Sequence, residues 1–379
     1  MRVIFTVTND LSYDQRMHRI CSTLAGNGYS VTLVGRKLPE SIPLEPQVYM
    51  QERLRSFFQK GFLFYAEYNL RLCLFLLFTP FDAVCSIDLD TLSAGCFATL
   101  IRRKKRVFDA HEYFTEVPEV VHRSIVKHFW GLVARICLPF YRHAYTVGPA
   151  LAEIFEAKYG LKFEVVRNVP AILKAADTFP APSHVVKGVQ LPSKWGSRGG
   201  LLYQGALNEG RGIETLLEAM QYLENAQLVL AGEGDLSVQL RQKARDLGLQ
   251  DRVVFLGYVK PEDLKQLTAQ AWLSLNLLEN RGLSYFYSLA NKFFDSVQAC
   301  VPVLTMDFPE YHALNAQYEV AVLLEELSPE SVAQAINSLL EDQEKYKKLQ
   351  QNCRLAREEW NWELEQKTLL NLWRQVEQD

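Results

Sequence analysis

Short runs of apolar and β-branched residues alternate with stretches of helical periodicity along most of the chain. The run Val3–Thr8 is followed by the helical stretch Asp14–Gly26 and then by a second apolar run, Ser30–Val34. Strands that are apolar throughout are buried on both faces, as in parallel sheets that helices cover on both sides. The alternation therefore predicts an α/β protein with parallel sheets.

The alternation is interrupted once, between residues 169 and 199. This stretch contains four prolines and ends in three closely spaced glycines, which is typical of a connection between domains. The strand and helix patterns resume at Leu201, and residues 329–378 are helical in pattern throughout. We expect an N-terminal domain at 1–170, a linker at 171–199 and a C-terminal domain at 200–361.

Composition and cysteine content restrict the class of protein. Hydrophobic residues make up 48% and charged residues 22% of the 379 residues, which excludes a disordered chain. The seven cysteines include no CxxC pair, so a zinc site is not expected, and the odd number favours a reducing compartment. The N-terminus reaches the polar Asn9 too early for a signal peptide, so we expect a cytoplasmic protein.

Two apolar segments raise the question of membrane contact. In Gly61–Phe81, Glu67 and Arg71 leave an uncharged run too short to span a bilayer, which favours a buried helix. Val120–Ala152 contains no acidic residue, and the basic run Arg102–Arg106 lies just upstream of it. Four apolar residues fall on one helical face of this segment: Ile125, Phe129, Leu132 and Ile136.

These features leave two interpretations open. The basic and apolar residues could form a patch that faces an anionic membrane from the cytoplasmic side. Alternatively, the apolar face packs on the core and the basic face is solvated. Residues 1–168 hold 21 Lys and Arg against 16 Asp and Glu, so a net charge of +5 fits an anionic surface or substrate. Nothing in the sequence indicates nucleic-acid binding.

A glycine-rich turn opens the C-terminal domain. Tyr203–Gly212 follows a predicted strand and precedes a predicted helix, so free backbone N–H groups and the helix dipole favour an anion there. Arg211 adds a guanidinium that can hold phosphate. A second turn, Ala231–Asp235, lacks the third glycine of a dinucleotide fingerprint, and we interpret it as a tight structural turn.

A polar group stands at the predicted start of a helix further along. Asn291 and Asp295 are four residues apart and share one helix face, and Lys292 lies between them. A carboxylate in this position suits a sugar diol, since it can accept two hydrogen bonds.

Several of these segments stand in the order seen in one family. The chain resembles retaining GT-B glycosyltransferases of the group 1, family-four type. The resemblance implies two Rossmann-like domains facing a cleft, with a C-terminal helix, residues 362–379, that crosses back to the N-terminal domain. The matching segments are Tyr203–Gly212, Leu230–Gly234, Val253–Val259 and Ser288–Val303.

The resemblance assigns roles on the donor side. Arg211 is expected to hold the pyrophosphate of a nucleotide-sugar, and Gly205 to let the backbone approach it. Asp295 matches the second acid of the family's E-x7-E element, which binds the ribose, and Asn291 and Lys292 belong to the same donor block. Tyr287 stands where the first acid would be, so this element is broken. The family's usual glycine is replaced as well, by Cys300.

The N-terminal half resembles the acceptor side of the family. The matching residues are Asn9, Asp14 and Arg16 near the N-terminus and Glu112 after a later strand. In the same later block, His111 is expected to face the donor sugar, where it could bind a hydroxyl or stabilise leaving-group charge.

No metal or cofactor is expected besides the nucleotide-sugar substrate. The pair Asp88 and Asp90 has the spacing of a metal-binding DxD, but it lies far in sequence from the donor block. We therefore expect these two carboxylates to line the site or to cap a helix.

The resemblance implies transfer of a sugar with retention of configuration, from a nucleotide-sugar to a glycan or lipid-linked acceptor, in cell-surface polysaccharide synthesis. Two alternatives remain at this point. One is a nucleotide-sugar epimerase on the same fold, which would need a dense acid–base set. The other is a non-catalytic relative, which the loss of an acid at Tyr287 suggests.

Overall fold

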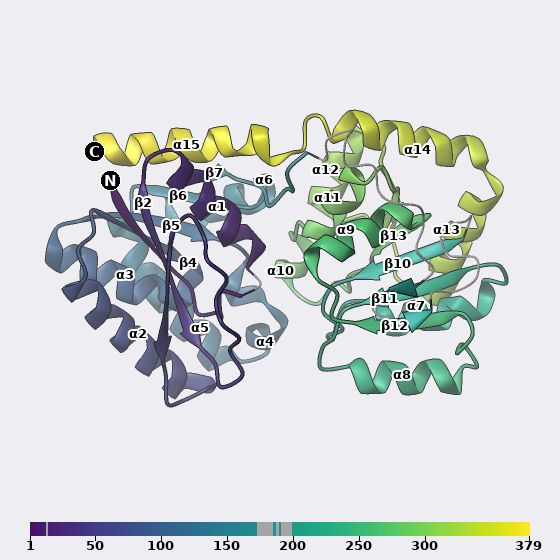
Figure 1. The fold of residues 1–379 in the computed structure, drawn as a ribbon, viewed down its shortest axis with the longest axis horizontal. Coiled ribbons are helices and arrows are strands. Elements are labelled where there is room, and N and C mark those ends of the chain that lie inside the picture. The colour runs from purple at the N-terminus through teal and green to yellow at the C-terminus, as the bar shows by residue number, and fades with distance from the viewer. Residues whose placement is uncertain (13, 173–184, 187–188, 191–198) are drawn as a thin grey trace. The chain divides into compact units, whose positions relative to one another are not determined.

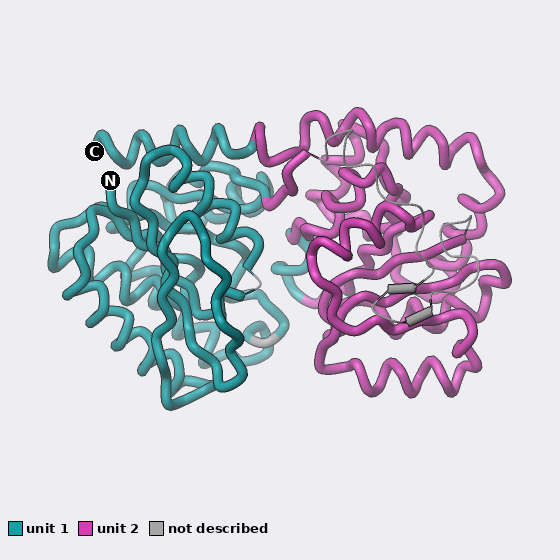
Figure 2. Tube along the Cα trace, viewed as in Figure 1, with its two compact units in different colours: residues 1–167, 282–287, 365–379 teal, residues 168–281, 288–364 magenta. Residues whose placement is uncertain are grey.

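The computed structural model describes residues 1–12, 14–172, 185–186, 189–190 and 199–379 (Figure 1). The chain forms two compact units (Figure 2). Unit 1 comprises residues 1–167, 282–287 and 365–379, and unit 2 comprises 168–281 and 288–364. Each unit contains a parallel sheet with alternating helices, which confirms the expected α/β class with two Rossmann-like domains.

The sheet of unit 1 has seven parallel strands in the order β3-β2-β1-β4-β5-β6-β7. The order reverses beside β1, where β2 and β4 lie on either side, and ligands of such sheets bind at the carboxyl ends of the strands near this point. The strands are β1 (Arg2–Thr6), β2 (Ser30–Lys37), β3 (Met50–Arg55), β4 (Ala83–Ile87), β5 (Lys105–Ala110), β6 (His143–Thr146) and β7 (Phe163–Val165).

The helices of unit 1 pack against this sheet. The first of them begins where the Asp14 side chain accepts a hydrogen bond from the Met17 N–H at 3.0 Å, a standard N-cap. The helices are α1 (Gln15–Gly26), α2 (Gly61–Phe78), α3 (Asp88–Arg102), α4 (Pro118–Val121), α5 (Ser124–Cys137), α6 (Pro149–Tyr159), α10 (Leu283–Phe286) and most of α15 (Trp362–Gln378).

The expectation that the apolar stretch at Gly61–Phe81 is a buried helix is correct for only one of its faces. Only every fourth residue of α2 is buried, from Phe64 to Leu76, and these side chains pack on the sheet. The opposite face of α2, at Leu70, Leu74 and Phe78, is exposed although it is apolar, and the positions between the two faces are partly buried. In the part of the chain that the structure describes, α2 is the one helix with the length and composition to cross a membrane, and 22% of that span is buried.

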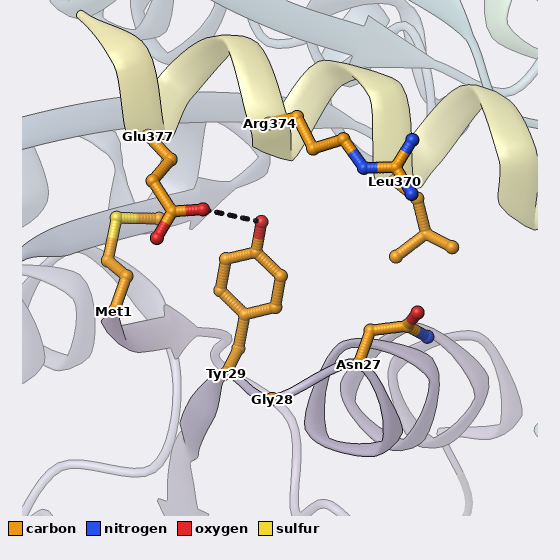
Figure 3. A pocket seen from close by; sticks show the side chains of 7 residues that line it. All are labelled: Met1, Asn27, Gly28, Tyr29, Leu370, Arg374 and Glu377. Carbon is orange, nitrogen blue, oxygen red and sulfur yellow. Dashed lines mark hydrogen bonds between the residues drawn. The ribbon is translucent and has the colours of Figure 1, made fainter.

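The last helix of the chain, α15, belongs to unit 1 from Glu365 onward. Trp373 is fully buried, and its ring centroid lies 5.4 Å from that of Phe5 on β1. Glu365 accepts hydrogen bonds from the Arg167 guanidinium at 2.9 and 3.0 Å. A pocket of about 180 Å³ lies between this helix and the start of the sheet, beside the contact between Tyr29 and Glu377 (Figure 3).

The sheet of unit 2 has six parallel strands in the order β12-β11-β10-β13-β14-β15. The strands are β10 (Gly200–Gln204), β11 (Gln227–Ala231), β12 (Val253–Gly257), β13 (Leu273–Asn276), β14 (Val303–Met306) and β15 (Ala321–Leu324). The helices are α7 (Ile213–Ala219), α8 (Ser237–Asp246), α9 (Pro261–Gln270), α11 (Asn291–Gln298), α12 (Pro309–Gln317), α13 (Pro329–Glu341) and α14 (Gln343–Ala356).

Three details differ from the sequence expectations. The edge strand β3 was not predicted, because its half-exposed sequence MQERLR contains no apolar run. Residues 329–378 form three helices, α13 to α15, since Asp342 caps the second through the Lys345 N–H. Most of the expected linker at 171–199 lies outside the described residues, and a short antiparallel pair, β8 (Val185–Val186) and β9 (Val189–Gln190), falls within it.

Replacing Cys300 with glycine should stabilise the fold. Cys300 has a φ of 58°, a left-handed conformation that costs a residue with a Cβ roughly 1–2 kcal/mol. Glycine removes this strain but loses more entropy on folding, so we expect a net gain of about 0.5–1 kcal/mol in the free energy of unfolding, measured with urea. Cys300→Ala is the control: it keeps the strain and loses only the contact with Arg357, so it should give no gain.

Candidate active site

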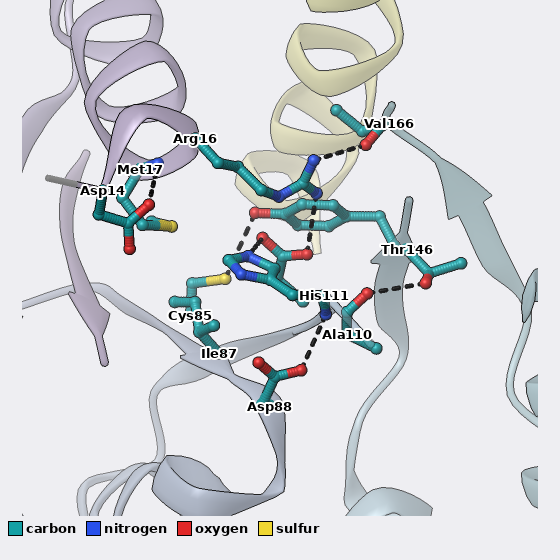
Figure 4. Close-up of polar contacts among 12 residues, drawn as sticks. Asp14, Arg16, Met17, Cys85, Ile87, Asp88, Ala110, His111, Thr146 and Val166 are labelled. Carbon is teal, nitrogen blue, oxygen red and sulfur yellow. Dashed lines mark hydrogen bonds and ion pairs between the residues drawn. The ribbon is translucent and has the colours of Figure 1, made fainter. Parts of the chain in front are cut away.

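A buried ion pair underlies the candidate site of unit 1 (Figure 4). The Arg16 guanidinium on α1 donates to the Asp109 carboxylate on β5 at 3.0 Å and to the Val166 carbonyl at 2.8 Å. The side chains of Arg16 and Asp109 are 4% and 0% exposed. The other oxygen of Asp109 lies 2.9 Å from Nε2 of His111, so Asp109 orients the imidazole.

The charges of this cluster shift one another's ionisation. Burial disfavours the charged imidazole, but the Asp109 carboxylate outweighs this effect and raises the pKa of His111. Burial acts against the carboxylate of Asp109 too, yet Arg16 and His111 hold its pKa below the ordinary value. With Nε2 directed at Asp109, Nδ1 is the ring nitrogen left to meet a ligand, and the His111 side chain is 21% exposed.

The DxD carboxylates lie beside His111, at the carboxyl end of β4. Asp88 accepts a hydrogen bond from the His111 N–H at 2.8 Å, and burial raises its pKa well above the ordinary value. Asp90 accepts one from the Thr8 hydroxyl at 2.5 Å, and burial raises its pKa to about 6. Both carboxylates thus accept hydrogen bonds from other residues of unit 1.

The residues expected on the acceptor side have different environments. Asn9 donates to the Asp14 carboxylate at 2.6 Å, so these two form one polar corner after β1. Glu112 is exposed next to His111. Arg16 is buried and donates to Asp109, so it supports Asp109. It does not line a surface that an acceptor could contact, contrary to the expectation from the sequence.

Unit 2 brings its predicted donor residues together at the carboxyl end of β10. A Cβ at Gly205, whose φ is 130°, would lie 3.4 Å from the Lys292 ammonium. That ammonium also lies 4.0 Å from the ring centre of Tyr203. Burial and the neighbouring charge of Arg211 hold the pKa of Lys292 well below the ordinary value. Two cations thus converge on a glycine turn, an arrangement that favours an anion.

The second glycine turn supports the first. A Cβ at Gly232 would lie 1.9 Å from the Gly205 carbonyl oxygen, and one at Gly234 would lie 2.2 Å from the Asn208 side chain. The two turns therefore pack backbone against backbone, and only glycine fits at their contact. This geometry matches the interpretation of Ala231–Asp235 as a tight structural turn.

The helix α11 presents the remaining donor residues. Asn291 is exposed at its first position, and Asp295 accepts a hydrogen bond from the Gln204 amide at 3.3 Å. Gln204 itself is buried and accepts a hydrogen bond from Thr268 at 2.7 Å. Tyr287, at the position of the family's first acid, is partly buried against the core of unit 1.

Sequence reasoning missed three supporting residues: Asp109, Gln204 and Tyr203. Each is a buried strand residue, and its role depends on a partner that lies far away in the chain. The one sequence signal that could have identified these residues is their position near the end of a predicted strand. Across the described residues, no group of three or more His, Cys, Asp or Glu side chains could hold a metal ion.

The paired parallel sheets, and the polar residues at the carboxyl ends of their strands, define the GT-B fold. Sucrose-phosphate synthase from Thermosynechococcus elongatus has this architecture at a TM-score of 0.76 and 15% identity, with 99% of each chain covered. Anabaena HepE, solved in complex with UDP and glucose, gives a TM-score of 0.72 at 16% identity, covering 98% of this chain and 99% of that one.

Residues 196–356 match the family model of glycosyl transferases group 1. The chain therefore has the GT-B fold, and the segment that matches the group 1 glycosyl transferase model contains all the residues predicted above for the donor side.

Two curated relatives match parts of the chain. An uncharacterised glycosyltransferase of Methanocaldococcus jannaschii is 40% identical over 74 residues, 19% of either protein. Alpha-monoglucosyldiacylglycerol synthase of Streptococcus pneumoniae is 31% identical over 222 residues, which are 52% of this chain and 48% of that protein. The chain thus matches less than half the length of either relative.

Replacing Asp90 with asparagine should stabilise the protein in a pH-dependent way. Because its pKa is raised from 3.8 to about 6, folded wild-type protein binds this proton more tightly than unfolded protein does. Wild-type stability from this group is therefore present below pH 4 and is lost as pH rises through 6. Asp90→Asn should be more stable than wild type at pH 8, by up to about 3 kcal/mol, and the advantage should vanish near pH 4.

Thermal unfolding from pH 4 to pH 8 measures this difference. The exposed Asp263 on α9 offers the matched control variant Asp263→Asn, measured over the same pH range. An Asp90→Asn advantage that does not vary with pH would show that folding does not raise the pKa of the Asp90 carboxyl.

Proposed function

We propose that this protein is a retaining glycosyltransferase that moves a hexosyl group from a nucleotide-sugar to a glycan or lipid-linked acceptor. The observation that carries the proposal is the convergence of Lys292 and Arg211 on the Gly205 turn in unit 2. A diphosphate there would neutralise the two neighbouring cations and so offset the cost of burying Lys292. Its oxygens would also accept hydrogen bonds from N–H groups of the turn.

The chemistry follows from these charges. When the bond between the anomeric carbon and the donor phosphate breaks, the departing diphosphate gains negative charge, and Arg211 and Lys292 stabilise it. The acceptor oxygen bonds to the anomeric carbon on the same face, and its proton passes to the departing phosphate. His111, held by Asp109, would bind a hydroxyl of the sugar through its free ring nitrogen. Asp295 would accept hydrogen bonds from the ribose.

The comparisons support a choice of substrates. The HepE complex makes UDP the first nucleotide to test, and the partial match to an alpha-monoglucosyldiacylglycerol synthase supports a lipid-linked acceptor. The free state of all seven cysteines supports a reducing compartment and hence the cytoplasmic side of a membrane. Cell-surface polysaccharide synthesis stays a prediction from the resemblance alone.

Arg211→Ala should weaken the binding of a nucleoside diphosphate. Loss of a charge-assisted hydrogen bond costs about 1.5–3 kcal/mol, so the dissociation constant of UDP should rise by about one to two orders of magnitude in calorimetry. Arg354 is an exposed arginine of the same unit, on α14, and Arg354→Ala should bind like wild type. An unchanged dissociation constant for Arg211→Ala, measured with UDP, GDP and ADP, would remove Arg211 from the site.

His111→Ala should reduce turnover more than donor affinity, because the imidazole would act mainly in the transition state. We expect a fall in kcat of about 10²-fold, the scale seen for one electrostatic stabiliser, with the dissociation constant of UDP nearly unchanged. The exposed His312 on α12 gives the control variant His312→Ala. Wild-type turnover in His111→Ala would mean a structural histidine, and a nucleotide-sugar that binds but never turns over would indicate a non-catalytic protein.

A further inference from the structure

Three helices of unit 1 expose large apolar side chains to solvent. On α2, Leu70, Leu74 and Phe78 follow one another at every fourth position and are 63%, 47% and 85% exposed. Ile101 on α3 is 68% exposed, and Ile125 on α5 is 87% exposed. We refer to these five side chains, together with Leu132 of α5, as the apolar face.

The apolar face extends over adjoining helices. The helix α3 packs against both α2 and α5 (Figure 1). The start of α2 also touches α5 directly, since the ring centroids of Phe62 and Phe129 lie 5.9 Å apart. The buried residues of α5 are Trp130, Ala134 and Cys137, so its apolar stripe points away from the core. This outcome excludes the interpretation that the stripe packs on the core.

Basic residues outnumber acidic ones on and next to these three helices. No acidic residue occurs in α5, and those of α3 are confined to its first turn, at Asp88 and Asp90. The one acid of α2 is Glu67, which is paired with Arg71 at 2.7 Å. Exposed arginines lie on or next to these helices, at Arg103, Arg123 and Arg135. An occupant of this face must therefore offer both apolar surface and negative charge.

The basic run at Arg102–Arg106 contributes less than the sequence suggested. Arg102 donates to the carbonyl oxygens of Leu76 and Thr79 and so caps α2. Lys104 pairs with Asp82 at 3.6 Å, and Lys105 donates to the Glu377 carbonyl. These three side chains make contacts within the protein. The exposed apolar side chains therefore offer a larger surface to an external partner than the basic run does.

We propose that the apolar face lies in the interfacial layer of an anionic lipid bilayer. The helix α2 does not cross the bilayer in this arrangement, because Phe64, Tyr68 and Leu72 on its opposite side are buried against the sheet. Amphipathic helices of this kind sink about 5–10 Å into the headgroup region, and neighbouring arginines meet anionic lipid phosphates. A second copy of this chain fits less well, since a self-complementary pairing of the face would bring arginines near arginines.

Flotation of the full chain with vesicles of phosphatidylglycerol and phosphatidylcholine tests this proposal. Wild type should float with these vesicles and bind vesicles of pure phosphatidylcholine more weakly. Leu74→Ser/Phe78→Ser should reduce the partition coefficient at least tenfold. The control Val238→Ser/Leu355→Ser removes two equally exposed apolar side chains from unit 2 and should float like wild type. Both variants should unfold at nearly the wild-type temperature, because the altered side chains are exposed.

Three results would overturn the proposal: wild type that ignores anionic vesicles, a Leu74→Ser/Phe78→Ser variant that floats as well as wild type, or a control that loses binding equally. Sedimentation velocity without lipid tests the alternative that a second copy of this chain covers the apolar face. In that case wild type would dimerise and Leu74→Ser/Phe78→Ser would not. Binding of UDP by both variants is measured separately, so failure of membrane docking is distinguishable from failure of the proposed transferase activity.

Discussion

The buried ion pair between Arg16 and Asp109 joins parts of unit 1 that are far apart in sequence. One guanidinium connects the first helix, the strand β5 and the carbonyl of Val166 after the last strand. Removing either partner from a buried pair leaves an uncompensated charge and costs about 3–5 kcal/mol. Because Asp109 also holds His111, the contact that stabilises the sheet is the contact that orients the imidazole. Stability and site geometry cannot be altered independently here.

In the candidate site of unit 2, charges of the same sign lie close together, whereas in unit 1 opposite charges are paired. Lys292 and Arg211 carry like charges close together, and burial further disfavours the charged ammonium. The Lys292 ammonium can lie beside the turn at Gly205 because this turn packs against the one at Gly232 with no Cβ between their backbones. The local fold thus maintains an electrostatic cost that a bound anion would relieve.

Much of this organisation could be predicted from the sequence, because apolar runs such as Ala83–Ile87 and Gln227–Ala231 coincide with observed strands. The clustering of Gly205, Arg211 and Lys292 follows from the rule that ligand residues gather at the carboxyl ends of parallel strands. The strand β3 could not be predicted, since pairing at a sheet edge leaves no apolar pattern. Nor could the exposure of α2: composition shows that a helix is apolar but not which of its faces meets the sheet.

The division of unit 1 into residues 1–167, 282–287 and 365–379 has a consequence for how the chain is made. Trp373 on α15 packs against Phe5 on the first strand. Because a ribosome makes the chain from its N-terminal side onward, the core of unit 1 stays incomplete until α15 has emerged. Unit 2 is interrupted only by residues 282–287 and ends at Leu364, so its chain emerges before that of unit 1 is complete. Synthesis of unit 1 thus begins before that of unit 2 and is completed after it.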